Sequence, residues 1–148
     1  EAAVFTGIVE ALGRVISVRS SSDGSTLTLA CETFSAELPI GSSIAVNGVC
    51  LTVTSTAPGS FTVDAVPETL TRTNLGTLVD GSPVTLQRAM PASGRFDGHV
   101  VQGHVDGVAV LKSRAPRGES VELVFGQPLT AAQCLEPLLI DGGLLAQP

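Results

Sequence analysis

Short apolar runs rich in β-branched residues recur along the first 90 residues, and turn signals separate them. Thr26–Ala30 alternates polar and apolar residues with the period of a half-buried strand. Asn47-Gly48, between two such runs, is typical of a hairpin turn. The runs predict six strands, within Val4–Val18, Thr26–Ala30, Ser43–Val46, Cys50–Thr54, Phe61–Ala65 and Pro83–Gln87. We therefore predict an all-β fold, a small closed six-stranded antiparallel barrel of Greek-key-like type.

The pattern restarts after a linker. Residues 89–97 (AMPASGRFD) show no periodicity and contain Pro, Ser and Gly. Beyond them, the segment Gly7–Glu10 aligns with Gly103–Asp106 at an offset of 96 residues, which indicates an internal repeat. We predict a first barrel over 4–90, a linker over 91–97 and a partial second copy over 98–148.

The second copy is expected to be incomplete. At the same offset, the last strand of the first barrel would recur near position 183, beyond Pro148. Residues 128–148 also depart from the template, because nothing there matches Asn47–Thr52. Half a barrel leaves edges unpaired, which favours self-association.

Composition excludes several function classes. The net charge is −6 and only eight Lys and Arg are present, so nucleic acid and anionic membranes are poor partner candidates. No apolar run approaches a membrane span in length, and the first residues do not resemble a signal peptide.

Three widely spaced cysteines (Cys31, Cys50 and Cys134) favour free thiols in a reducing compartment, and we expect a cytoplasmic protein. They form no CxxC pair, and His99 and His104 lack a third ligand nearby in the sequence. No metal site is therefore predicted.

Four segments together resemble riboflavin synthases, a family of lumazine-binding barrels. They follow in family-like order and spacing and cover residues 5 to about 110. The segments are Phe5–Glu10, Val46–Val53, Glu68–Gly76 and Gly98–Gly107.

The resemblance implies a reaction. Members of that family transfer a four-carbon unit between two molecules of 6,7-dimethyl-8-ribityllumazine, giving riboflavin and a pyrimidinedione. No metal or redox cofactor takes part. The family enzyme is typically a trimer with a site between barrels of different subunits, and an isolated first barrel could pair as a dimer.

The resemblance also implies site residues. Gly7, Ile8 and Val9 would meet the ring through their backbone, and Cys50, Leu51 and Thr52 would form one wall. Gly103, His104 and Val105 would open the site of the second barrel. Cys50, Thr52 and His104 are the candidate catalytic residues. The ribityl chain would be wrapped by Asp64, Ala65, Val66, Pro67, Glu68 and Thr69.

Simpler interpretations stay open for several of these residues. Cys50 alone would be a small buried hydrophobe, and a nucleophilic role is not expected. His99 is more typical of a surface turn, whereas a ligand-facing or proton-transfer role is favoured for His104. Glu68 and Thr69 could cap a helical turn that begins at Pro67. Asp64 could be a solvated strand end, and Gly7 and Gly103 could relieve strain at a kink.

Two other functions remain possible. The chain could be a non-catalytic lumazine or flavin binder of the same superfamily, which the incomplete second copy favours. It could also be an enzyme of specialised metabolism that reuses the barrel for another substrate.

Overall fold

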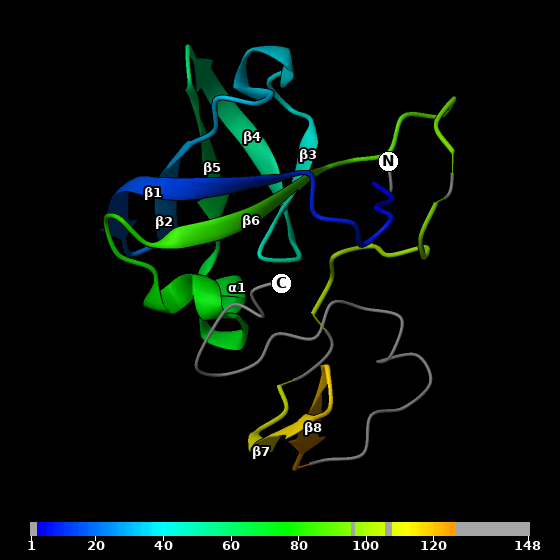
Figure 1. Ribbon diagram of the computed structural model, residues 1–148. Helices are drawn as coiled ribbons and strands as arrows, with labels where there is room; N and C mark the ends of the chain where they lie inside the picture. The colour runs from blue at the N-terminus through cyan, green and yellow to red at the C-terminus, as the bar shows by residue number, and fades with distance from the viewer. Residues whose placement is uncertain (1–2, 96, 106–107, 127–148) are drawn as a thin grey trace.

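The protein contains a closed antiparallel barrel of six strands (Figure 1). The computed structural model describes residues 3–95, 97–105 and 108–126. Around the barrel the order is β1-β2-β5-β4-β3-β6. The strands are β1 (Ala11–Ser21), β2 (Gly24–Ala30), β3 (Ser43–Val46), β4 (Val49–Ala57), β5 (Ser60–Ala65) and β6 (Pro83–Arg88).

The topology confirms the predicted barrel. Strands β3, β4 and β5 follow one another as hairpins, and β6 returns to lie beside β3, which is a Greek-key arrangement. The long strand β1 closes the barrel because Ala11–Arg14 pair with β6 while Arg14–Ser21 pair with β2. A bulge between Val15 and Ser17 accompanies this change of partner.

The first strand occupies only the later part of the β-rich run Val4–Val18. It begins at Ala11 and extends to Ser21. Gly7 has φ +79°, a left-handed conformation that interrupts an extended backbone. The segment before it pairs elsewhere, in an isolated antiparallel bridge between Phe5 and Val101.

Alternating apolar residues fill the barrel. Leu27 and Leu29 on β2 and Val84 and Leu86 on β6 are fully buried, while the residues between them face outward or lie under covering segments. Full burial of each such Leu or Val contributes roughly 1.5–3 kcal/mol. Because side chains fill the interior of the barrel, a ligand-binding site is expected on its outer face.

The connections follow the expected turn chemistry. Asn47 (φ 51°) and Gly48 (φ 82°) are both left-handed, as a tight hairpin turn requires, and the Asn47 side chain accepts a hydrogen bond from the Thr85 N–H at 2.9 Å. The predicted helical turn is the helix α1 (Pro67–Arg72), with proline at its start. Two 3₁₀ turns, η1 (Ser35–Glu37) and η2 (Asn74–Thr77), complete the connections.

A hairpin follows the barrel, formed by β7 (Leu111–Arg117) and β8 (Ser120–Phe125) (Figure 1). Its strands fall at the positions that the 96-residue offset assigns to β1 and β2, since Leu123 and Phe125 on β8 correspond to Leu27 and Leu29 on β2. The predicted divergence over 128–148 lies outside the described residues. The second copy and the domain limits therefore stay predictions.

Within the described part of the chain, no helix has the length and apolar character needed to cross a membrane.

Candidate ligand-binding site

The outer face of β4 and β5 brings several of the predicted site residues together. Cys50 and Thr52 share one face because side chains alternate along a strand. Thr52 is the cross-strand partner of Asp64 on β5, and both side chains are exposed. Asp64 accepts a short hydrogen bond (2.6 Å) from the Thr26 hydroxyl on β2. A row of hydroxyl and carboxylate groups therefore crosses three neighbouring strands and is open to solvent.

Two predicted site residues point the other way, Leu51 of the wall and Ala65 of the ribityl-binding segment. Leu51 and Ala65 are 6% and 2% exposed, and their side chains belong to the barrel core. They can offer a ligand only backbone atoms. The expectation that Leu51 forms part of the wall is wrong for its side chain, because strand alternation turns it inward.

The start of α1 borders this face, directly after β5. Val66 is 57% exposed, and Pro67 and Glu68 are also exposed, while Thr69 is half-buried. Glu68 forms an ion pair with Arg72 one turn later. The alternative that Glu68 and Thr69 cap the helix is wrong, since Val66 is the N-cap residue and no side chain caps it.

Gly103 lies against the first barrel, at Cys50. The Cys50 N–H donates to the Gly103 carbonyl at 2.8 Å, and Gly103 is buried. Val105 packs against the barrel core, while the His104 side chain is exposed between them. We expected residues 103–105 to open the site of a second barrel. Their contacts place Gly103 at Cys50 and Val105 against the core of the first barrel.

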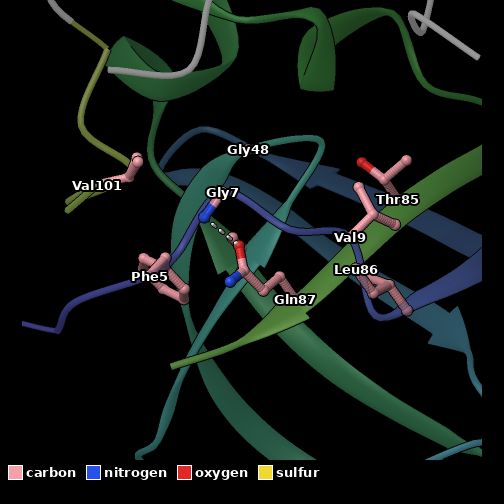
Figure 2. Close-up of a pocket in the computed structure, with 9 residues that line it drawn as sticks. Phe5, Gly7, Val9, Gly48, Thr85, Leu86, Gln87 and Val101 are labelled. Carbon is pink, nitrogen blue, oxygen red and sulfur yellow. Dashed lines mark hydrogen bonds between the residues drawn. The ribbon is translucent and has the colours of Figure 1, made fainter. Parts of the chain in front are cut away.

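Residues 7–9 occupy a different position, over β6. The Gly7 N–H donates to Oε1 of Gln87 at 3.2 Å (Figure 2). The Nε2 of Gln87 donates to the Thr6 hydroxyl at 2.6 Å. Gly7 and Val9 line a cavity of about 80 Å³ together with residues of β3 and β6. Ile8 and Val9 are 49% and 41% exposed. The structure therefore separates residues 7–9 from the wall that the sequence led us to expect around Cys50.

The two segments meet through a small second core outside the barrel. Phe5 (1% exposed) and Val101 (7%) cover Ala45 on β3. Their backbones exchange two hydrogen bonds, of 2.7 Å from the Phe5 N–H and 3.0 Å from the Val101 N–H. Residues 5–7 and 101–103 thus form one clamp across the outer face of β6, β3 and β4. We call this pair of segments the clamp below.

The Cys50 thiol is not prepared for nucleophilic attack. Partial burial raises its pKa above the ordinary value, and a hydrogen bond with Ser43 opposes that shift only in part. A thiol with a raised pKa stays protonated at neutral pH, and the thiolate is the reactive form. Cys50 therefore suits a neutral wall better than a covalent catalyst.

A metal ion has no obvious place among the residues described. No three His, Cys, Asp or Glu side chains gather there in a group that could hold one. His99 is exposed, and its N–H donates to the Thr6 carbonyl at 2.9 Å, so its backbone serves the clamp.

Sequence reasoning missed three residues of this region. Gln87, Ala45 and Thr26 carry no motif, and each becomes relevant only through its position in the sheet. Ala45 is the cross-strand partner of both Cys50 and Gln87, so the three residues form a row across β4, β3 and β6. A strand register of this kind cannot be read from a single local motif.

The fold and this face define the class: a small Greek-key barrel domain with a polar outer face next to its helix. The chain belongs to the lumazine-binding domain family, whose model matches residues 6–89.

Known relatives agree with this assignment. Riboflavin synthase of Bacillus subtilis (strain 168) is 42% identical over 142 residues, which is 94% of this chain and 66% of the relative. Riboflavin synthase of Actinobacillus pleuropneumoniae is 44% identical over 117 residues, 79% of this chain and 54% of the relative. The chain thus spans between about half and two thirds of the length of these relatives.

The fold recurs in a solved structure of LumP in complex with riboflavin. That structure superposes with a TM-score of 0.70 at 21% identity, over 84% of this chain and 67% of LumP. At this identity the likeness concerns the fold.

Proposed function

We propose that this chain is the lumazine-binding part of a riboflavin synthase. In this proposal the first barrel binds 6,7-dimethyl-8-ribityllumazine on the outer face of β4 and β5. The carrying observation is the position of Gly103 at Cys50, because it brings two segments of the family pattern, far apart in the sequence, to one place. The relatives reported above, which match this chain over most of its length, are riboflavin synthases.

The chemistry of the face suits the two halves of that ligand. The flat ring would lie near Cys50 and residues 103–105, where thiol, backbone and aliphatic groups surround it. The ribityl chain carries hydroxyls, which match the row formed by Thr52 and Asp64 and the start of α1. Polar groups that fix orientation beside an apolar wall are typical of small-molecule sites.

The reaction places modest demands on the protein. The 7-methyl group of the lumazine is acidic because the ring delocalises the resulting anion. Transfer of four carbons between two identical molecules requires no external oxidant or reductant. Holding the two molecules in opposed register can by itself lower a barrier by roughly 7–11 kcal/mol. In this proposal Thr52 and His104 assist by hydrogen bonding or proton transfer, and Cys50 acts as a neutral wall.

Residues 7–9 would serve a second lumazine site. Gly7 and Gly103 share one conformation, with φ +79° and +76°, and lie 96 positions apart. Residues 103–105 reach the first barrel, so the equivalent residues 7–9 would reach a second barrel in the same way. Exposed Ile8 and Val9 fit that role. Such a pair of sites, in one assembly of several chains, would hold the two substrates, and we expect this assembly in the cytoplasm.

A second candidate function is lumazine or flavin binding without turnover. It is favoured by the presence of one complete barrel among the described residues. One barrel supplies one site, whereas the transfer needs two bound molecules.

The deciding experiment is to add 6,7-dimethyl-8-ribityllumazine to the purified chain, measure binding by fluorescence and follow riboflavin by absorbance. Turnover supports the synthase, and binding without turnover supports the binder. Absence of binding to both lumazine and riboflavin overturns the proposal.

A matched pair of variants tests the position of the site. Thr52→Val removes a hydroxyl from the proposed site, and we expect lumazine to bind about fivefold to tenfold more weakly. Thr54→Val removes a hydroxyl two residues along β4, where it contacts Thr62 at 2.8 Å, and should leave binding unchanged. Equal effects of the two variants would contradict the proposed position.

A further inference from the structure

The buried side chain of Gln87 lies at one end of the row beneath the clamp, and Cys50 lies at the other. Both residues flank Ala45 as cross-strand partners on the outer face of the sheet. Neighbouring strands are about 4.8 Å apart, so Gln87 and Cys50 are separated by about 10 Å. Gln87 is therefore linked to Cys50 through the clamp and not by direct contact.

Gln87 is nevertheless buried, with 8% exposure, although it faces away from the barrel interior. The clamp buries it, and the polar atoms of its side chain both bond to the clamp. Oε1 accepts from the Gly7 N–H and Nε2 donates to the Thr6 hydroxyl. Figure 2 shows the side chain directed at this segment, beside Phe5.

Further hydrogen bonds within the clamp connect the Gln87 contacts to Cys50. The Thr6 carbonyl accepts from the His99 N–H at 2.9 Å, and Phe5 pairs with Val101 in both directions. Two residues after Val101, the Gly103 carbonyl receives the Cys50 N–H. A continuous set of hydrogen bonds thus runs from Gln87 to Cys50 through residues 5–7 and 99–103.

We propose that Gln87 is a positioning residue, which fixes the clamp and thereby holds Gly103 at Cys50, with His104 and Val105 directly after it. This inference rests on the proposed function where it concerns lumazine binding, but not where it concerns the clamp. The barrel strands do not depend on it, because their own ladders are complete without the Gln87 side chain.

Three variants of the full chain test this role. Gln87→Leu keeps the size of the side chain and removes both hydrogen bonds to the clamp. Gln87→Glu keeps two acceptor oxygens, which can receive the Gly7 N–H and the Thr6 hydroxyl proton, and should restore the clamp. Leu29→Val removes a methylene from the barrel core and serves as the control for a general loss of stability.

The first measurement is amide hydrogen exchange without ligand. In Gln87→Leu we expect exchange at the Phe5 and Cys50 amides to accelerate about tenfold relative to Val53, whose amide bonds to the Ser42 carbonyl within the barrel region. In Gln87→Glu and Leu29→Val the ratio should stay within about twofold of the wild type. An unchanged ratio in Gln87→Leu, or no rescue by Gln87→Glu, overturns the proposal.

The second measurement is the Kd for 6,7-dimethyl-8-ribityllumazine. We expect Gln87→Leu to raise it about tenfold and Gln87→Glu to leave it within about twofold. If the wild type binds no lumazine, the proposed function fails, while the exchange data still decide the role of Gln87. If exchange accelerates but the Kd does not change, residues 103–105 do not contribute to binding, and the link to ligand binding is refuted.

Discussion

Two equivalent glycines offer an internal comparison of the contact between the clamp and the barrel. Gly7 and Gly103 have φ +79° and +76°, so replacing either by alanine places a Cβ in the same left-handed backbone. That strain costs about 1–2 kcal/mol at each position. The surroundings differ. A Cβ at Gly7 would meet Cγ2 of Val101 at 3.6 Å, an ordinary contact, whereas a Cβ at Gly103 would lie 2.9 Å from both the Cβ and the N of Cys50.

Gly103→Ala should therefore be the more damaging variant. The Cys50 atoms belong to the backbone and Cβ of a barrel strand and cannot withdraw easily. The clamp must move instead, which stretches the 2.8 Å bond from Cys50 to Gly103, worth about 1 kcal/mol. We expect Gly103→Ala to lower the free energy of unfolding by about 2–4 kcal/mol, against about 1–2 kcal/mol for Gly7→Ala.

Urea unfolding of the two variants measures this difference, and hydrogen exchange at Cys50 shows whether residues 101–103 have detached locally. Local detachment would appear as fast exchange at Cys50 in Gly103→Ala with the barrel amides still protected. Equal losses in the two variants, together with an equally protected Cys50 amide, would refute the reasoning that Gly103 is held in contact with β4.

Two further predictions concern single residues of the first barrel. Burial raises the pKa of the Cys50 thiol, so its alkylation by iodoacetamide should reach half its maximal rate at a higher pH than the alkylation of glutathione. Mass spectrometry of the peptide that contains Cys50 measures this rate. A midpoint at or below the glutathione value would contradict the burial. Folding keeps the proton on this thiol to higher pH. The resulting contribution to the free energy of unfolding is complete below the pKa of the unfolded thiol and disappears as the pH rises through the pKa of the folded thiol. The variant Cys50→Ser should lack this decline. Asn47→Ala should lower the free energy of unfolding by about 2–3 kcal/mol, because it forces alanine to φ 51° and leaves the Thr85 N–H without its acceptor. Asn47→Gly also loses this acceptor and the 3.4 Å hydrogen bond from Nδ2 to Asn74, as alanine does, but it adopts φ 51° without strain and should cost less in the same urea titration. An equal cost would show that backbone strain contributes little there.

Much of the barrel was predictable from the sequence because its determinants are local. The alternation in Thr26–Ala30, the Asn47-Gly48 turn and the proline that begins α1 each act within a few residues, and each lies where the pattern indicated. The exception is the run from Val4. Its composition favours a strand, but composition does not reveal the left-handed Gly7 or the pairing of Phe5 with a residue beyond the linker.

The family resemblance indicated residues of the candidate site, whose role in binding stays a prediction, but not their arrangement. It indicated Cys50, Thr52 and Asp64, and strand alternation places their side chains on one outer face. The same alternation turns Leu51 inward, which motif matching alone does not consider. Gln87 was missed because its importance depends on two long-range hydrogen bonds, to residues 80 and 81 positions earlier.

The position of residues 103–105 shows what a repeat in a sequence leaves undetermined. An offset of 96 residues equates Gly103 with Gly7, but it does not say which barrel each of them serves. The pairing favours one answer, because Val101 lies 96 positions after Phe5 and the two form an antiparallel bridge. An antiparallel bridge between equivalent residues relates the flanking segments by an approximate twofold axis. Under such an axis, residues 7–9 and residues 103–105 leave the bridge in opposite directions and reach opposite sides of it. Residues 103–105 reach the first barrel, so under the proposed function residues 7–9 would present their exposed side to a second barrel. The exposure of Gly7 and the burial of Gly103 agree with this proposal.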